Sequence, residues 1–246
     1  MNALRAYGWW LGLALLAPIA LPLAVRARRN TLRLPPAGGL LSGVAGADLP
    51  GQPLRLLVLG ESTVVGVGVD ELHAALVGQL ATALALRCSR PVAWRACGES
   101  GITAAQAHER LLPQVLEQPF DLALLVFGVN DTTRLTSLSR WEAALGGMAG
   151  ALAARGAQVA FSSVPPLQHF SALPWLLRRL LGMRAGLLDG RLRQLATGLG
   201  MGHHAVELEF SAEFLARDGY HPSGLGYRIW AQGLAVSLAP SEHCAP

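Results

Sequence analysis

Residues 54–63 read LRLLVLGEST, an apolar run that ends in a glycine and, two positions later, a serine. The run is interrupted only by Arg55 and has the length of a strand that is buried on both faces. Similar runs occur at 92–97, 122–127 and 158–162, with a weaker one near 204–208. Helical patterns lie between and after them, near 70–87, 103–117, 139–155, 186–199 and 223–238. This alternation predicts an α/β domain of three layers, in which helices cover both faces of a mostly parallel sheet.

Ligands of such sheets bind beyond the carboxyl ends of the strands, so the loops that follow the strands are where a site is expected. The predicted loops are 60–69, 98–102, 128–138, 163–185 and 209–222. Polar residues suited to begin the helices as N-caps are Asp70, Thr103, Ser139 and Ser223.

Composition excludes several classes of protein. Hydrophobic residues make up 52% of the 246 residues and charged residues 15%, which excludes a disordered chain. All 20 basic residues are arginine, and no basic stripe is interleaved with aromatic residues, so a nucleic-acid partner is not expected. The arginines concentrate at 26–33 and 178–193, beside very apolar stretches, which favours a membrane surface as partner. The sequence does not indicate an oligomeric state.

Residues 1–29 are predicted to be an N-terminal membrane segment. No residue from Ala6 to Val25 is charged, and a helix of about 20 residues spans the core of a bilayer. Arg26, Arg28 and Arg29 follow directly, a pattern that favours an anchor with the rest of the chain on the cytoplasmic side. Two alternatives remain open: a signal peptide that is cleaved on export, and a buried helix of the domain itself.

Residues 30–53 are predicted to be a linker, and residues 54–240 the folded domain. The linker is rich in proline and glycine, a composition that predicts no regular structure between its ends.

The loops after the strands contain residues that are suited to acyl chemistry. Ser62 follows the first strand, where a glycine lets the backbone turn and a serine can point into the crevice. Asn130 follows the third strand, and its side-chain amide can donate a hydrogen bond to a developing oxyanion. Gly101 follows the second strand and can offer a backbone N–H at close range.

The segment DGYHP at 218–222 could supply a base for the serine. A serine hydroxyl is a weak nucleophile until a base accepts its proton, and histidine suits that task near neutral pH. Asp218, three residues before His221, can orient the imidazole if the loop curls into one turn.

Four short blocks together resemble the SGNH hydrolase family, the GDSL-like lipases and esterases. They are GES at 60–62, Gly101, GVND at 128–131 and DGYHP at 218–222, in the order of that family and spread over residues 54–238. The resemblance implies a flavodoxin-like sheet in the three-layer fold, with Ser62 as nucleophile, His221 as base and then acid, and Asp218 as the residue that orients it. It also implies an oxyanion hole from the N–H groups of Ser62 and Gly101 and the side chain of Asn130.

One position departs from the family, and one serine competes for the assignment. Glu61 stands where the family usually has aspartate, so the carboxylate reaches one methylene further, and we expect it to bond loop groups rather than take part in the chemistry. Ser100 also lies in a GES tripeptide after a strand, but the family places Gly101 in that block. We therefore expect Ser62, not Ser100, to be the nucleophile.

Other motifs are weaker. The elbow G-x-S-x-G is absent, the glycines at 66 and 68 lack the third glycine of a dinucleotide loop, and a Walker lysine is excluded because the chain has none. His203, His204 and Glu207 match no zinc spacing, so we expect no metal and no cofactor. The stretch 173–199 is open to two interpretations: a lid or acyl-chain wall that touches lipid, and an ordinary amphipathic helix packed on the sheet.

The sequence thus predicts a membrane-associated serine hydrolase of carboxylic esters or thioesters, and the apolar approach to the site favours lipid esters. Acyl transfer or deacetylation at the same site is one alternative. A binding module that has the fold without the chemistry is another.

Overall fold

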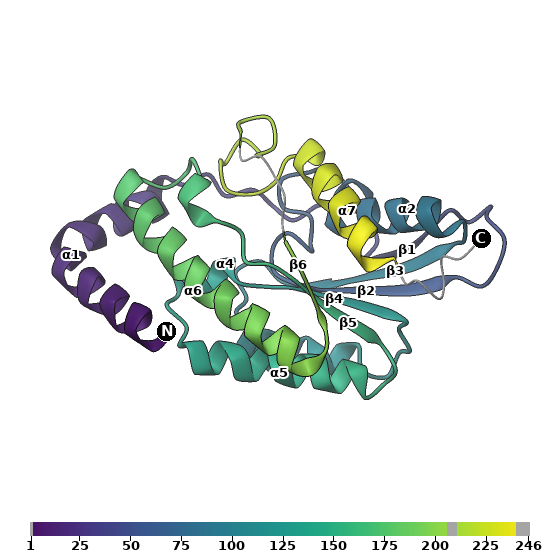
Figure 1. Ribbon diagram of the computed structural model, residues 1–246. Helices are drawn as coiled ribbons and strands as arrows, with labels where there is room; N and C mark the ends of the chain where they lie inside the picture. The colour runs from purple at the N-terminus through teal and green to yellow at the C-terminus, as the bar shows by residue number, and fades with distance from the viewer. Residues whose placement is uncertain (1, 206–210, 240–246) are drawn as a thin grey trace.

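A computed structural model describes residues 2–205 and 211–239 of the chain (Figure 1). The strands are β1 (Ser42–Ala45), β2 (Leu54–Gly60), β3 (Val92–Gly98), β4 (Leu122–Val126), β5 (Gln158–Ser162) and β6 (Gly202–His204). The helices are α1 (Asn2–Asn30), α2 (Leu76–Cys88), α3 (Ala104–Arg110), α4 (Val129–Thr133), α5 (Leu138–Ala153), α6 (Trp175–Leu199) and α7 (Gly224–Leu238). Short 3-10 helices lie at η1 (Leu72–Ala74), η2 (Leu112–Gln114) and η3 (Leu167–His169).

The described strands form one sheet in the order β1-β3-β2-β4-β5-β6. All neighbouring strands are parallel except β1, which pairs antiparallel with β3 at the edge. Without β1, the order is β3-β2-β4-β5-β6, which is that of a flavodoxin-like sheet. In such a sheet the direction in which strands are added reverses between the first and third strands. The predicted fold class is therefore confirmed, and the reversal lies where β2 meets β3 and β4.

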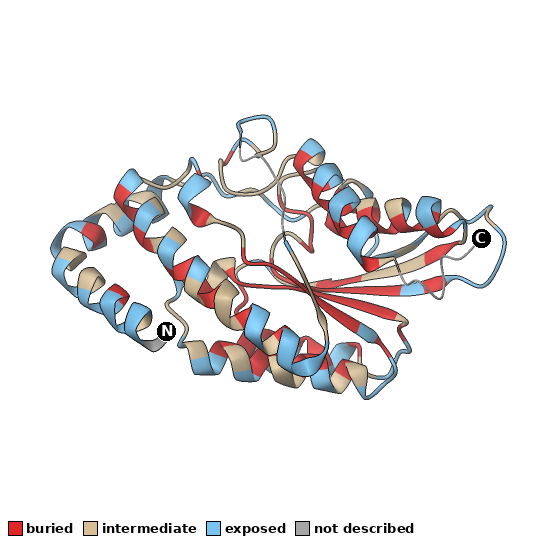
Figure 2. Ribbon diagram, in the orientation of Figure 1, coloured by how far each residue is buried: buried red, intermediate tan, exposed pale blue. Residues whose placement is uncertain are grey.

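Helices cover both faces of the sheet, as Figure 1 shows, with α2 and α7 on one side and α5 and α6 on the other. Successive side chains of β2 alternate between the two layers because a strand has a period of two. Leu57 and Leu59 pack with the α5 and α6 side, and Leu56 and Val58 pack with α2 and α7. Strands β2, β4 and β5, in the middle of the sheet, are almost entirely buried (Figure 2), which explains their continuous apolar sequences.

Three predictions about local structure were wrong. The segment 30–53 contains a strand, because β1 adds four residues to the open edge of β3. Helix α6 begins at Trp175, well before the predicted start at 186, because Pro174 fixes the turn that precedes it. Ser137, not Ser139, caps α5 by accepting a hydrogen bond from the N–H of Arg140.

Two further N-cap predictions are confirmed and one is wrong. Thr103 forms a capping box with Gln106 at the start of α3, and Ser223 caps α7 by accepting from Gly226. Asp70 begins no helix, since η1 starts after Glu71. The last predicted strand, 204–208, falls largely outside the described residues, and β6 ends at His204.

The apolar helix α1 lies against α6 at one end of the molecule (Figure 1). Ala20 of α1 packs against Leu176, Leu177 and Leu180 of α6. The indole Nε1 of Trp9 donates to the backbone oxygen of Leu180 at 2.8 Å. Helix α6 in this region therefore packs against α1, and neither of the two interpretations of 173–199 had included that contact.

Candidate active site

The turn after β2 is shaped by the close approach of β4. A Cβ atom on Gly60 would lie 2.2 Å from the backbone oxygen of Val126, so only glycine fits where the two strands end together. Ser62 follows two residues later, outside the carboxyl edge of the sheet, and is half-buried. The loop then folds back through a hydrogen bond from the Val67 N–H to the backbone oxygen of Ser62 at 3.0 Å.

Ser62, His221 and Asp218 are joined in one hydrogen-bonded chain. His221 Nε2 lies 2.9 Å from Ser62 Oγ, and His221 Nδ1 lies 2.6 Å from Asp218 Oδ2. A carboxylate only accepts hydrogen bonds, so the tautomer that fits Asp218 has its proton on Nδ1, which leaves Nε2 to accept from the serine hydroxyl. This is the protonation state in which histidine can remove a proton from serine.

Asp218 is held in the ionised form. Its side chain is only 1% exposed, and its other oxygen accepts from the backbone N–H groups of Tyr220 and His221, each at 3.0 Å. Burial opposes the charge, but the hydrogen bonds from the His221 ring and from these two N–H groups outweigh it and hold the pKa of Asp218 below its ordinary value. A permanent negative charge therefore faces the imidazole and would stabilise its protonated form.

The loops that carry the serine and the histidine are fastened to each other. The buried hydroxyl of Tyr227, on α7, donates to the backbone oxygen of Val67 at 2.7 Å. Gly68 adopts φ +110°, and a Cβ there would lie 2.4 Å from the backbone oxygen of Pro222. The distance between Ser62 and His221 is thus set by backbone contacts on both sides of it.

Three groups in this region have N–H donors available for a ligand. Within the described residues, neither the Ser62 N–H nor the Gly101 N–H donates to a protein acceptor. Asn130 donates through Nδ2 to Glu61 at 2.9 Å, which leaves the second hydrogen of the amide available. These residues follow β2, β3 and β4, which are neighbours in the sheet.

Glu61 fixes the position of Asn130. The Glu61 side chain is buried, and its carboxyl accepts from the N–H of Gly128 at 2.6 Å and from the backbone N and Nδ2 of Asn130 at 3.2 and 2.9 Å. Burial raises the pKa of Glu61 to about 8, although the backbone hydrogen bonds act in the opposite direction. The longer side chain of glutamate thus reaches the β4 loop, in agreement with the local bonding expected for it.

Asp131 has a positional role that the sequence did not reveal. It is fully buried, and its Oδ2 accepts from the N–H of Ala104 at 2.9 Å, at the first residue of α3. Burial raises its pKa, and hydrogen bonds oppose the shift. Asp131 thereby ties the loop of Gly101 to the loop of Asn130, and its place beside Asn130 in the GVND block was the only signal for this.

A mostly apolar pocket opens beside Ser62 and His221. Its walls combine the ends of β4 and β5 with the 214–222 segment and α7. The apolar lining residues include Val126, Phe127, Val129, Phe170, Phe214, Leu215, Tyr220 and Trp230. Trp175 and Leu176, proposed from sequence as part of an acyl-chain wall, are not among its lining residues.

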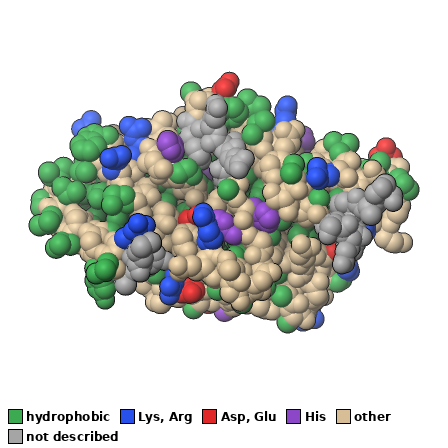
Figure 3. All heavy atoms as spheres, in the orientation of Figure 1, with side chains coloured by type: hydrophobic (Ala, Val, Ile, Leu, Met, Phe, Trp, Pro, Cys, Tyr) green, Lys and Arg blue, Asp and Glu red, His purple; other side chains and the backbone are tan. Residues whose placement is uncertain are grey.

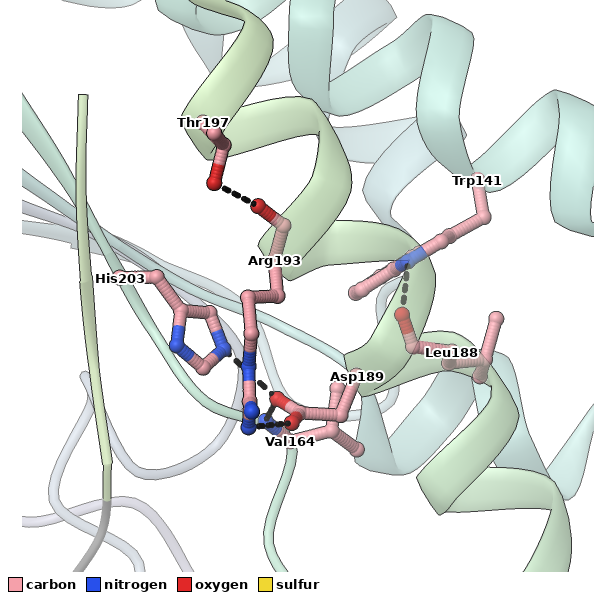
Figure 4. Close-up of polar contacts among 7 residues, drawn as sticks. All are labelled: Trp141, Val164, Leu188, Asp189, Arg193, Thr197 and His203. Carbon is pink, nitrogen blue, oxygen red and sulfur yellow. Dashed lines mark hydrogen bonds and ion pairs between the residues drawn. The ribbon is translucent and has the colours of Figure 1, made fainter. Parts of the chain in front are cut away.

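The competing candidates lie apart from this arrangement. Ser100 is exposed, and the described hydrogen bonds connect it to no histidine. His203 bonds Asp189 Oδ1 at 2.9 Å, and the same carboxylate receives Arg193 and the Val164 N–H (Figure 4). Asp189 on α6 thus ties β6 to the loop after β5, which is a structural role.

The described residues contain no cluster of histidine, cysteine or carboxylate side chains suited to a metal ion. His203 and His204 lie in β6, whereas Glu207 falls outside the described residues.

Comparison with known proteins gives concordant results. A model of the GDSL-like lipase/acylhydrolase family matches residues 58–229. The GDSL-like esterase Rv1075c of Mycobacterium tuberculosis is 27% identical over 198 residues, which are 75% of this chain and 62% of that protein. The chain therefore spans less than two thirds of the length of this relative.

Two solved structures share the fold. The lipase/acylhydrolase of Enterococcus faecalis superposes with a TM-score of 0.61 at 19% identity, over 76% of this chain and 95% of that one. The psychrotrophic esterase EstA of a Pseudoalteromonas species, in a form inhibited by monoethylphosphonate, gives 0.59 at 16% identity, over 74% and 95%.

Proposed function

The chain belongs to the GDSL-like lipase/acylhydrolase family, and from that premise we propose that it hydrolyses carboxylic esters through an acyl-enzyme on Ser62. Membership of the family and the similarity to an esterase support a hydrolase that acts on ester bonds. The acyl-enzyme on Ser62 is supported above all by the continuous chain of hydrogen bonds from Ser62 through His221 to Asp218.

In the proposed first step, Ser62 Oγ attacks the ester carbonyl carbon and gives its proton to His221 Nε2. The imidazolium that forms is stabilised by the Asp218 carboxylate, which holds Nδ1–H in place. The carbonyl oxygen becomes an oxyanion that accepts from the N–H groups of Ser62 and Gly101 and from Asn130 Nδ2. When the tetrahedral intermediate collapses, the alcohol leaves with the proton from His221.

In the second step, water replaces the alcohol. His221 removes a proton from the water, which attacks the acyl carbon, and the carboxylic acid leaves as the proton returns to Ser62 Oγ. A thioester would follow the same course with a thiol as leaving group. The apolar pocket supports an apolar acyl group as the part of the substrate that lies next to Ser62.

Hydrolysis of p-nitrophenyl acetate and octanoate by two serine variants tests this function. Ser62→Ala should abolish turnover of both esters, with a loss of about 10⁴-fold or more, because the nucleophile is gone. Ser100→Ala is the matched control, since it removes a serine hydroxyl from the second GES tripeptide, at 98–100. This variant should retain most of the activity. Loss of activity in Ser100→Ala with turnover intact in Ser62→Ala would reject the assignment.

We also propose that α1 attaches the protein to a membrane. Leu4–Asn30 is long and apolar enough to cross a bilayer: its most apolar window of 18 residues has a mean hydropathy of 1.8, and only 11% of that window is buried by the protein. Its exposed apolar side chains favour contact with lipid over contact with water. Recovery of the full chain in the soluble fraction after cell lysis, without detergent, would contradict this proposal.

A further inference from the structure

One side of α1 faces the surface of the domain from Trp9 to Ala27. The buried and half-buried side chains recur with spacings of three and four residues, at Trp9, Leu13, Leu16, Ala20, Leu23 and Ala27. That spacing places them in a single stripe on the helix. Several of them pack against Leu173, Leu176, Leu177 and Leu180, at the start of α6.

The docking of α1 includes polar contacts that a loosely attached anchor would lack. Arg184 of α6 is 1% exposed, and its guanidinium lies over the rings of Trp9 and Trp10, 5.1 and 5.5 Å from their centroids. Trp9 Nε1 also bonds the Leu180 oxygen at 2.8 Å. Because Arg184 would lose this cover if α1 moved away, the contact belongs to the fold of the domain.

The remaining sides of α1 are apolar and exposed. Leu4, Leu11, Leu15, Ile19 and Val25 have between 50% and 81% of their surface accessible. Figure 3 shows hydrophobic side chains gathered at the end of the molecule that α1 occupies, with basic side chains beside them. A helix that is apolar on all sides needs cover on all sides, and the domain covers only one of them.

A second groove lies where the C-terminal part of α1 meets the segment that carries Asp218. It has a volume of about 380 Å³, which is within the range of small-molecule sites. Arg26 lines it from α1, Arg217 from the opposite wall, and Leu23 and Pro174 contribute apolar surface. In the described chain neither guanidinium has an ion-pair partner.

The surface around the groove is also basic. Arg28, Arg29 and Arg33 follow in sequence, and Arg178 and Arg179 lie on the first turns of α6. None of these five forms an ion pair with any described residue. A basic rim next to an exposed apolar helix matches the depth at which lipid phosphates lie above acyl chains.

We propose that α1 lies in the plane of the membrane, docked on α6, and that the groove between Arg26 and Arg217 binds the headgroup of an anionic phospholipid. Because α1 is docked on α6 from Trp9 to Ala27, it cannot cross the bilayer unless α6 enters the bilayer too. In the in-plane position the exposed apolar sides of α1 face the acyl chains. The groove then lies at headgroup level, next to Asp218 and hence beside the site that acts on esters.

This inference rests on the proposed attachment of α1 to a membrane, and the first experiment separates the two. The full chain is incubated with vesicles of phosphatidylcholine alone or with phosphatidylglycerol added, and its partition is measured by flotation over a series of lipid concentrations. We expect binding to both compositions, and stronger binding to the anionic vesicles. Failure to float with either would reject the attachment itself.

A pair of double variants tests the groove. Arg26→Gln with Arg217→Gln should weaken partition into anionic vesicles about 30-fold and leave partition into neutral vesicles unaffected, since each arginine near an anionic surface contributes a factor of about five. Arg87→Gln with Arg155→Gln is the control, because it removes the same charge from two exposed arginines, in the last turn of α2 and just after α5, that form no ion pair with a described residue. Equal losses in both pairs, or no loss in the first, would overturn the headgroup site.

Chemical labelling of cysteines introduced near the start of α1 and in the segment that follows it tests the in-plane position. Arg5→Cys and Leu40→Cys chains, with the parent chain as background, are treated with a membrane-impermeant maleimide in spheroplasts and again after lysis. An in-plane helix predicts that both new cysteines react from the same side of the membrane. Reaction of one before lysis and of the other only after lysis would show that α1 spans the membrane.

Discussion

The carboxyl edge of the sheet and the docked α1 helix are held in place by different kinds of contact. At the edge, Ser62, His221, Asp218 and Glu61 take part in hydrogen bonds of 2.6 to 3.2 Å, and both carboxyl groups are buried. On α1, a stripe of apolar side chains and one indole hydrogen bond make the contact, and most of the helix is exposed. Figure 2 makes the same contrast visible.

The contrast indicates which part of the molecule carries chemistry and which carries location. Buried polar groups depend on one another, because removal of one leaves its partner unsatisfied at a cost of about 1–3 kcal/mol or more. Apolar contacts on an exposed helix are individually weaker and spread over many residues. Substitutions at the edge should therefore affect turnover or its pH dependence, whereas substitutions on α1 should affect membrane binding.

The largest effect is expected for Asp218→Asn. The asparagine amide would donate to His221 Nδ1 and so stabilise the tautomer that cannot accept the proton of Ser62. We expect kcat for p-nitrophenyl acetate to fall about 10⁴-fold, as is typical when the carboxylate of such a triad is replaced by an amide. Steady-state kinetics of variants with unchanged circular dichroism provide the measurement, and a loss of less than tenfold would separate Asp218 from the chemistry.

The next effect concerns Glu61 and the pH dependence of stability. Its pKa is raised to about 8 in the folded protein, against 4.5 as the ordinary value. The neutral carboxyl thus contributes stability in full below pH 4.5, and this contribution is lost as the pH rises to 8. The difference corresponds to a decrease of about 5 kcal/mol in the free energy of unfolding.

Glu61→Gln removes this ionisation, so its free energy of unfolding should decrease less than that of the parent between pH 5 and 8. Denaturant unfolding at several pH values measures the two slopes. Trp9→Phe, on α1, is the control and should retain the slope of the parent. Parallel curves for Glu61→Gln and the parent would show that Glu61 is already ionised at pH 5.

Asn130→Ala should have a smaller effect on turnover than the loss of Asp218. It removes one proposed donor to the oxyanion, for which a decrease in kcat of about 10²–10³-fold is typical. Gln158→Ala, which removes a carboxamide from an exposed position of β5, should leave kcat unchanged. An effect of Asn130→Ala on KM alone would assign the residue to ground-state binding.

The smallest effect is expected for Trp9→Phe. The change keeps an aromatic ring over Arg184 but removes the hydrogen bond to the Leu180 oxygen. We expect a decrease of about 1 kcal/mol in the free energy of unfolding and no change in turnover of a soluble ester. A loss of turnover comparable to that of Asn130→Ala would show that α1 also contributes to catalysis at the carboxyl edge of the sheet.

Much of the edge could be predicted from the sequence because its signals are local. The apolar runs that became β2 and β4 are buried almost throughout, so they carry no polar alternation, and the loops after β2, β3 and β4 each begin at or beside a glycine. Ser62, Gly101 and Asn130 follow directly from those ends. The chain itself therefore gives their order, and the parallel sheet brings them to one edge.

The parts that were missed depend on contacts between distant segments. Strand β1 is only four residues long, contains a glycine and is half-exposed, so its sequence resembles a loop until the open edge of β3 is known. Arg184 is buried under Trp9 and Trp10, 174 or more positions away in the chain, and nothing in 175–199 indicates that partner. The groove of Arg26 and Arg217 also exists only because α1 folds back onto the domain.

Covalent labelling shows directly whether Ser62 is the nucleophile. The full-length protein is treated with a fluorophosphonate, digested, and the modified peptide is identified by mass spectrometry alongside Ser62→Ala and Ser100→Ala. We predict one adduct, on Ser62, that is absent from Ser62→Ala and retained in Ser100→Ala. An adduct on Ser100, or a folded parent protein that shows no adduct, would contradict the assignment of Ser62 as the nucleophile.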